Sequence, residues 1–171
     1  ARRQSAKVRR ARPGIVVSVR LPLDGSAAGR AVALARLGVD VIHLEGDNHG
    51  TGLGARRKEF ATRLVREVHE ALLGRAVRDQ VTVLYSGGIA LAEHAAKMII
   101  CGADGVGVDT AALVALECRA CPDCAGRTAC PVSLDEVPVE YGAQRIVNLL
   151  GSWHDQLIEV LGAMGLREVR R

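Results

Sequence analysis

The stretch Val81-Thr-Val-Leu-Tyr85-Ser-Gly-Gly88 decides the fold, because an apolar run rich in valine ends there in a serine and two glycines. Such a run is typical of a strand, and the turn after it leads into a helix that we expect over residues 91–100. Outward from this stretch the same order recurs three times. Strands are predicted at 15–21, 39–44 and 104–108, and the helices that follow them at 26–37, 57–73 and 110–116.

Side-chain patterns refine two of these helices. Ser26 is the predicted N-cap of the first. The helix over 57–73 is amphipathic, and its expected buried stripe is Phe60, Leu64, Val68, Ala71 and Leu72. A last helix is expected over about 142–164. Four strand–helix units in a row predict an α/β fold with a parallel sheet and right-handed crossovers, which is half of an eight-stranded (β/α)8 TIM barrel. A small, open, doubly wound sheet is the alternative.

Composition narrows the class of protein. Hydrophobic residues make up 49% of the 171 residues, enough for a real core, whereas aromatic residues at 2% argue against a base-stacking surface. Residues 1–12 carry six basic side chains, and removing them from the net charge of +4 leaves about −2 for the rest. We therefore expect no nucleic-acid partner. With no apolar run of membrane-spanning length and no signal peptide, we expect no membrane role and a reducing, cytoplasmic location.

Four of the five cysteines fall within thirteen residues, with two, two and five residues between them and a proline after the last. Thiolates at such spacings can close around one metal centre, and the run is similar to the bacterial ferredoxin pattern of iron–sulfur ligands. The predicted ligands are Cys118, Cys121, Cys124 and Cys130. A four-thiolate zinc site and a disulfide network are the alternatives. The fifth cysteine, Cys101, is expected to be a small buried apolar residue.

Two glycine-containing turns follow the last two predicted strands, where barrels of this kind usually hold a phosphate. Ser86, Gly87 and Gly88 form the first turn, whose backbone N–H groups can approach an anion closely. The second contributes Gly107, Asp109 and Thr110. A carboxylate beside a phosphate is unfavourable unless it points away, so Asp109 counts against an anion there.

The loop over residues 45–54 holds the candidate catalytic residues. Glu45, Asp47 and His49 can be placed against a substrate carbonyl or a bound ring, since barrel active sites are built from such loops. The alternative for this loop is a flexible surface loop solvated by its polar side chains. Arg20, near its strand end, is a candidate cation for a phosphate, a carboxylate or a reduced flavin. The alternative for Arg20 is a side chain that extends into solvent at the strand end. His43, in mid-strand, is expected to be a satisfied core histidine.

Taken in order, these features resemble the FMN-binding synthase domain of the glutamate synthase large subunit. The resemblance rests on six segments, namely Val17–Leu21, Gly46–Gly52, Ser86–Ile89, Gly102–Leu113, Cys130-Pro-Val132 and the final helix with Val147-Asn148. It covers the last four units of that family's barrel, so it implies a C-terminal half barrel. Three residues depart from the family pattern: Arg20 replaces lysine, Ser86 replaces aspartate and Asp109 replaces glycine.

The resemblance implies FMN at the barrel mouth, held by Arg20, the loop residues Gly50, Thr51 and Gly52, and the two phosphate turns. It implies a [3Fe–4S] cluster on Cys118, Cys124 and Cys130, which Cys121 as a fourth ligand would convert to [4Fe–4S]. The implied reaction, part of ammonia assimilation, is the reduction of 2-iminoglutarate, formed from 2-oxoglutarate and ammonia, to glutamate. The alternatives are an iron–sulfur electron-transfer or assembly subunit without productive flavin, and a zinc-stabilised interaction module.

The predicted organisation is a basic arm at 1–13, an FMN-binding half barrel at 14–116, a cluster loop at 117–141 and a C-terminal helix at 142–171. A half barrel leaves sheet edges and an apolar face uncovered. We therefore expect a partner that supplies the other half: another chain, a second copy, or the lost start of the same polypeptide. The expected ligands are a 2-oxo or imino acid and a redox partner protein, and we predict no activity for the chain alone.

Overall fold

The computed structural model describes residues 2–119, 121, 132–165 and 167. Its centre is a four-stranded parallel sheet with the strands in chain order. The strands are β1 (Ser18–Pro22), β2 (Val41–Glu45), β3 (Thr82–Ser86) and β4 (Gly105–Gly107). The crossover helices are α2 (Ala27–Arg36), α3 (Ala61–Leu73) and α4 (Ala92–Ile100). Short 3-10 turns, η1 (Gly54–Arg56) and η2 (Arg78–Gln80), precede and follow α3.

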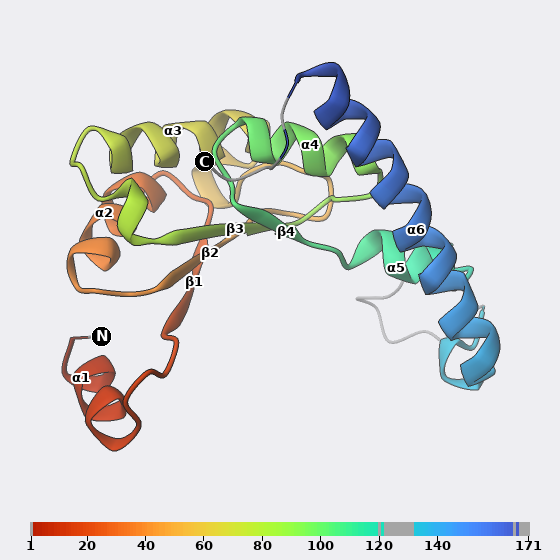
Figure 1. Ribbon diagram of the computed structural model, residues 1–171, viewed down its shortest axis with the longest axis horizontal. Helices are drawn as coiled ribbons and strands as arrows, with labels where there is room; N and C mark the ends of the chain where they lie inside the picture. Colours follow the sequence, from red (N-terminus) through yellow and green to blue (C-terminus); the bar gives the residue numbers. More distant parts are fainter. Residues whose placement is uncertain (1, 120, 122–131, 166, 168–171) are drawn as a thin grey trace.

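The two faces of the sheet differ. On one face Leu21, Ile42, Leu44, Val83 and Tyr85 are fully buried, beneath α2, α3 and α4, which lie together on one side of the sheet (Figure 1). Burying one such aliphatic side chain contributes about 1.5–3 kcal/mol.

The alternate residues of the same strands form the other face. They include Arg20, which is exposed, and His43, Glu45 and Ser86, which are half-buried. We call this the open face. Helices on one side of a parallel sheet fit a section of a barrel rather than a doubly wound sheet, so the predicted α/β half barrel is confirmed.

Within the residues that the structure describes, three further helices lie outside the sheet layers. α1 (Arg2–Ala11) precedes β1, and α5 (Thr110–Ala115) follows β4. The long α6 (Val139–Ala163) follows the 3-10 turn η4 (Leu134–Glu136) and buries Trp153. It runs beside α4 and α5 (Figure 1). Of the helices in the described ranges, none is long and apolar enough to span a bilayer.

Arg9 ties the basic N-terminal segment to the fold. Arg9 donates to the Asp40 carboxylate at 2.6 Å and to the Gly38 carbonyl at 2.7 Å. Asp40 also accepts from the Val17 backbone N–H at 2.7 Å. That backbone bond, followed by the bond from Arg9, lowers the pKa of Asp40.

Two sequence predictions were wrong in detail. The helix expected from residue 57 begins at Ala61, and Phe60, expected in the buried stripe, is 74% exposed. Phe60 occupies the extended N-cap position, where its side chain falls outside the helical stripe, and it bridges Thr51 instead. Ser26 precedes α2 but makes no side-chain cap; its hydroxyl bonds the Asp24 carboxylate at 2.6 Å. Leu64, Val68 and Leu72 are buried as predicted, whereas Ala71, expected in the same stripe, is half-buried.

Candidate functional site

At the carboxyl edge of the sheet, the loop over residues 46–52 packs against the turn after β3. The Gly46 N–H donates to the Ser86 carbonyl at 2.9 Å. Gly87 and Gly88 have φ of 122° and 66°. A Cβ on Gly87 would lie 2.7 Å from the Asp47 carbonyl oxygen, and one on Gly88 would lie 2.3 Å from the Gly50 nitrogen. The glycine pair therefore lets two loops touch, a role that the sequence prediction of close anion approach did not include.

The same turn retains donors for a ligand. The backbone N–H groups of Gly87 and Gly88 have no hydrogen-bond acceptor among the residues that the structure describes. The carbonyl of Gly87 is held from below, since the buried Tyr85 hydroxyl donates to it at 2.8 Å. Burial raises the pKa of Tyr85, so its hydroxyl stays a donor. A fixed turn with unpaired amides is suited to an anion or a carbonyl oxygen.

The loop over 46–52 is braced from within by Asp47. Its Oδ1 accepts from the backbone N–H groups of His49 at 2.9 Å and Thr51 at 2.8 Å. Burial opposes ionisation, but the bonds from Thr51 and His49 outweigh it and lower the pKa of Asp47. Asp47 thus shapes the loop. His49 is exposed above the sheet edge. Catalytic roles for Asp47 and His49 stay predictions.

Four polar side chains meet on the open face. Arg20 lies 3.6 Å from Glu45 in an ion pair, and His43 Nε2 lies 2.9 Å from Ser86 Oγ. Three of these residues are among the predicted site residues, whereas His43 was expected only as a core histidine. The signal for it was available, since His43 alternates with the apolar residues 42 and 44 and falls on the same face as Glu45.

In the turn after β4, the Asp109 carboxylate occupies one of the backbone N–H groups that could bind a ligand. Asp109 is exposed, and its Oδ1 accepts from the Thr110 backbone N–H at 2.6 Å, which caps α5. One of the loop amides expected to contact a phosphate, that of Thr110, is therefore occupied, and a phosphate contact from the Thr110 hydroxyl stays a prediction. Gly107 keeps the neighbouring space free, because a Cβ there would stand 3.2 Å from that of Ser86. The β3 turn fits an anion better than the β4 turn.

The predicted metal ligands are only partly described. Cys118 follows α5 and is half-buried, as is Cys121, while Cys124 and Cys130 lie outside the described residues. The iron–sulfur site therefore stays a prediction. Cys101, expected to be buried, is half-buried at the end of α4, and burial raises its thiol pKa.

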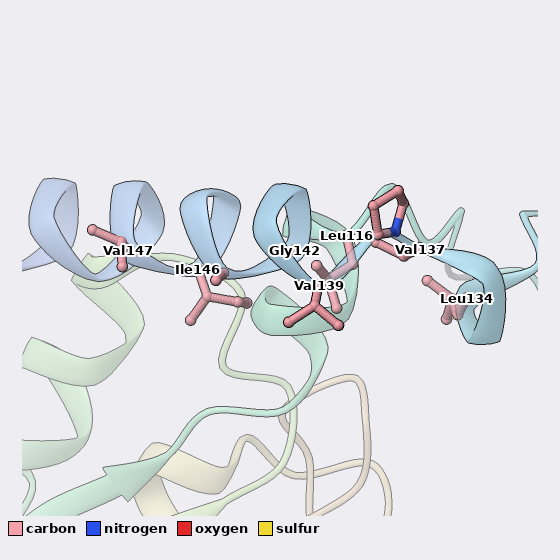
Figure 2. Close-up of a pocket in the computed structure, with 9 residues that line it drawn as sticks. Leu116, Leu134, Val137, Val139, Gly142, Ile146 and Val147 are labelled. Carbon is pink, nitrogen blue, oxygen red and sulfur yellow. The ribbon is translucent and has the colours of Figure 1, made fainter.

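An open hollow of about 530 Å³ lies beside the first turns of α6. Figure 2 shows its lining side chains, among them Leu116, Val137, Val139 and Ile146, gathered along one side of that helix. The lining is apolar, so the hollow offers no group for acid–base or phosphate chemistry, and it is separate from the carboxyl edge of the sheet.

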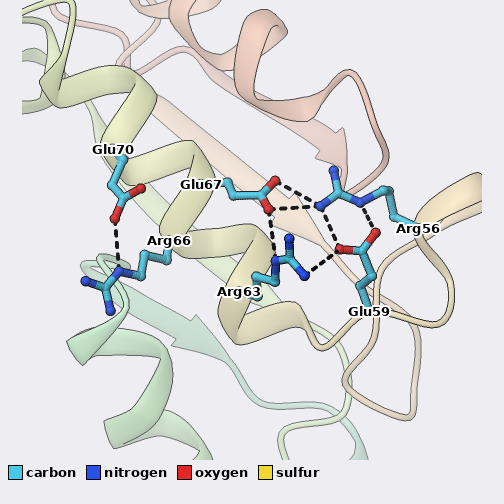
Figure 3. Close-up of polar contacts among 6 residues, drawn as sticks. All are labelled: Arg56, Glu59, Arg63, Arg66, Glu67 and Glu70. Atoms are coloured by element: carbon cyan, nitrogen blue, oxygen red, sulfur yellow. Dashed lines mark hydrogen bonds and ion pairs between the residues drawn. The ribbon is translucent and has the colours of Figure 1, made fainter.

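Ion pairs hold η1, the segment that follows the 46–52 loop, against α3. Arg56 donates to Glu59 through Nε and, at 2.8 Å, through Nη2, and it donates through Nη2 to both oxygens of Glu67 at 3.0 Å. Arg63 pairs with the same two glutamates (Figure 3). Arg66 and Glu70 form a separate, more exposed pair. Because η1 has no other side-chain bond to α3 among the described residues, Arg56 fixes where the loop leaves the site.

We expect Arg56→Met to lower the thermal midpoint by about 3 °C, because it removes four charge-assisted hydrogen bonds at once. Arg66→Met is the matched control and should lower it by less than about 1 °C, since exposed pairs contribute little. Differential scanning calorimetry checks both. Equal shifts would show that the ion pairs of Arg56 with Glu59 and Glu67 stabilise the fold no more than an ordinary surface pair.

Two histidines predict the acid sensitivity of the fold. Burial, then Arg20, lowers the pKa of His43; burial, then Arg78, lowers that of His69, whose Nδ1 accepts from Arg78 at 3.0 Å. A histidine with a lowered folded-state pKa binds its proton more weakly folded than unfolded. Such a histidine therefore contributes stability at pH values above its unfolded-state pKa of about 6.5. That contribution is lost as the pH falls through the folded-state pKa.

We therefore expect the free energy of unfolding in urea to decrease on acidification below about pH 6.5, before the carboxyl groups titrate. His69→Gln should flatten that decrease. Stability that is constant or rises between about pH 7 and about pH 5 would contradict the assignment of neutral histidines.

Known proteins are similar in sequence to this chain over most of its length. A sequence profile described as a conserved region in glutamate synthase matches residues 4–167. The archaeal glutamate synthase [NADPH] of Methanocaldococcus jannaschii is 30% identical over 167 residues, covering 90% of this chain and 32% of that protein. The archaeal-type enzyme of Thermotoga neapolitana is 32% identical over 168 residues, with the same coverage. The chain thus spans about a third of the length of these relatives.

Solved structures agree on the fold. The flavin-binding domain of baker's yeast flavocytochrome b2 superposes with a TM-score of 0.64 at 17% identity, covering 97% of this chain and 35% of that one. A mandelate oxidase mutant with a monooxide FMN adduct gives 0.59 at 20% identity, covering 97% of this chain and 42% of that one. These likenesses establish the shared fold.

Proposed function

The chain belongs to the glutamate synthase family, and from that premise we propose that it forms the flavin-holding part of a glutamate synthase-like oxidoreductase. The proposed reaction is the reduction of 2-iminoglutarate, formed from 2-oxoglutarate and ammonia, to glutamate. One observation carries the proposal: the 46–52 loop and the Ser86–Gly88 turn meet at the carboxyl edge of the sheet, beside the polar cluster of the open face. Barrel enzymes build their sites at that edge.

FMN is the proposed cofactor. It supplies hydride transfer when bound. The unpaired amides of Gly87 and Gly88 are proposed to bind its phosphate or a carbonyl oxygen, and Arg20 and the Ser86 hydroxyl to bind from the open face. Thr51, between Gly50 and Gly52 in the facing loop, is proposed to contact the flavin from the side of that loop. Glu45, ion-paired with Arg20, is the proposed group for holding or moving a proton near the substrate.

An iron–sulfur cluster is proposed at Cys118, Cys121, Cys124 and Cys130, either [3Fe–4S] or [4Fe–4S]. Support comes from the ligand type and spacing, because soft thiolates favour such clusters. We propose that the cluster receives electrons from a redox partner protein and that the protein acts in the cytoplasm.

A further partner is proposed for the open face. In a closed barrel this face points inward, so the remaining strands would cover the half-exposed side chains. They would come from another chain, a second copy, or another part of a longer polypeptide. The length of the relatives supports the last source.

A second candidate function is an electron-transfer or assembly subunit that holds the cluster without productive flavin. The Asp109 carboxylate favours it, because it occupies the Thr110 amide that a phosphate would otherwise contact. The two functions differ in flavin content.

The test is an absorption spectrum of anaerobically purified protein, with iron, zinc and released flavin quantified on the same sample. Iron and FMN together are expected. Glutamate formation from 2-oxoglutarate and ammonia with a chemical reductant is expected only when the partner that completes the barrel is present. Iron without flavin would favour the second candidate. Zinc with neither would contradict both.

Asp109→Asn should strengthen FMN binding about tenfold, because it removes a negative charge from the turn after β4, the strand paired with β3, whose turn is the proposed phosphate site, while asparagine still caps α5. Riboflavin, which lacks the phosphate, is the control ligand, and its affinity should not change. Titration of flavin fluorescence measures both. An equal gain for riboflavin would place the phosphate elsewhere.

A further inference from the structure

His43 on β2 and Ser86 on β3 are joined across the open face, with 2.9 Å between Nε2 and Oγ. They are 43 positions apart in the chain. The register aligns Glu45 with Ser86, which places His43, two residues earlier on the same face, diagonally beside the serine. The pair therefore exists only because of the strand register.

Space is kept open next to this pair. Gly107 on β4 is aligned with Ser86, and a Cβ at Gly107 would lie 3.2 Å from Ser86 Cβ and 3.8 Å from His43 Nε2. Any larger side chain on β4 would lie against the pair. The serine hydroxyl is thus held from one side by His43 and left accessible from the other, one residue before the unpaired amides of Gly87 and Gly88.

Burial of the ring, and then the charge of Arg20, favour the neutral form of His43. Arg20 faces it from β1 and lowers its pKa after burial, and Glu45 on β2 opposes them with a smaller effect. The residues that face it from β3 and β4, namely Leu84, Ser86, Gly105 and Gly107, carry no charge. A neutral imidazole has one N–H and one lone pair, so Nε2 has a single role toward the hydroxyl and fixes its direction.

We infer that His43 is a positioning residue of the flavin site, which orients the Ser86 hydroxyl toward a ligand bound at the Ser86–Gly88 turn. The inference rests on the proposed function, since the ligand is the proposed FMN. A hydroxyl that is already oriented loses less freedom when the ligand binds. On protonation both ring nitrogens become donors, so Nε2 must donate to Ser86 Oγ whatever the earlier arrangement, and the added charge lies beside Arg20.

The test is a double-mutant cycle on FMN affinity, measured by flavin fluorescence with the purified protein. His43→Leu and Ser86→Ala should each weaken binding about fivefold to tenfold. The double variant should bind no more weakly than Ser86→Ala alone, because the effect of His43 passes through the serine. His43→Gln, whose amide can replace one ring nitrogen, should recover most of the affinity. His69→Gln, remote on α3, is the control and should not change it.

The outcomes separate the inference from the function on which it rests. A wild-type protein that binds no FMN overturns both. Wild-type binding with additive effects of the two substitutions, or with no recovery in His43→Gln, overturns the positioning role alone. If His43→Leu does not fold by urea unfolding, the pH profiles of wild type and His43→Gln decide. A change in affinity below about pH 6.5 that wild type shows and His43→Gln lacks is expected, and parallel profiles overturn the inference.

Discussion

Gly88→Ala is expected to destabilise the protein by about 3 kcal/mol or more, because the new methyl group has no space and the backbone opposes it. Its Cβ would lie 2.3 Å from the Gly50 nitrogen, 2.7 Å from the Gly50 Cα and 2.9 Å from the His49 carbonyl carbon. These are backbone atoms, so relief requires moving the 46–52 loop away from the β3 turn. The left-handed φ of 66° adds about 1–2 kcal/mol.

Gly50→Ala is the matched control for this substitution. Gly50 lies in the facing loop with φ of 74°, but nothing stands within 4 Å of its Cβ position. It should therefore cost only the backbone term of about 1 kcal/mol. Urea unfolding of both variants at neutral pH measures the difference. Equal losses would show that the two loops do not interlock as described.

The consequence for the site is direct. Natural domains are stable by only about 5–15 kcal/mol, so Gly88→Ala removes a large fraction of that margin. In protein that remains folded, the displaced loop should also lose FMN affinity. Gly88 therefore serves the fold first and the ligand second.

Asp104→Asn is the second large effect, with an expected loss of about 3–5 kcal/mol. Asp104 pairs with Arg78 at 2.9 Å, and the two side chains are 9% and 13% exposed. Arg78 also donates to the carbonyls of Val81 at 3.0 Å and Gly102 at 2.8 Å, which fixes it in place. Neutralising the aspartate leaves a nearly buried guanidinium without its carboxylate.

Asp40→Asn is the control, because the two aspartates occupy equivalent positions. Asp40 immediately precedes β2, and Asp104 immediately precedes β4. Each carboxylate accepts a hydrogen bond at 2.7 Å from a backbone N–H, that of Val17 for Asp40 and that of Val83 for Asp104. The Asp40–Arg9 pair is about 40% exposed, so its loss should cost about 1 kcal/mol or less. Urea unfolding compares them. A similar cost at both sites would contradict the role assigned to burial.

Much of the fold could be predicted from short stretches of sequence. Apolar runs such as 81–85 and the glycine-marked turns after them predicted the strand–helix order, because alternation and turn chemistry depend on neighbours in the chain. Phe60 shows the limit. Its spacing fits the stripe of α3, but helix initiation at Ala61 leaves it outside.

The site divides in the same way. The residue types after each strand indicated loops for a ligand, and the family resemblance, confirmed by the match over residues 4–167, indicated which ligand to propose. The orientation of Asp109 toward Thr110 could not be predicted, because a capping bond competes with solvent and ligand only in the folded turn.

The sequence by itself determined the parallel α/β architecture, the turns that follow its strands and the family to which the chain belongs. Only the tertiary structure decided that His43 meets Ser86 and that Gly88 lies against Gly50. The physical reason is that periodicity and turn preference are local properties. Strand register and loop packing are instead set by contacts between segments tens of residues apart.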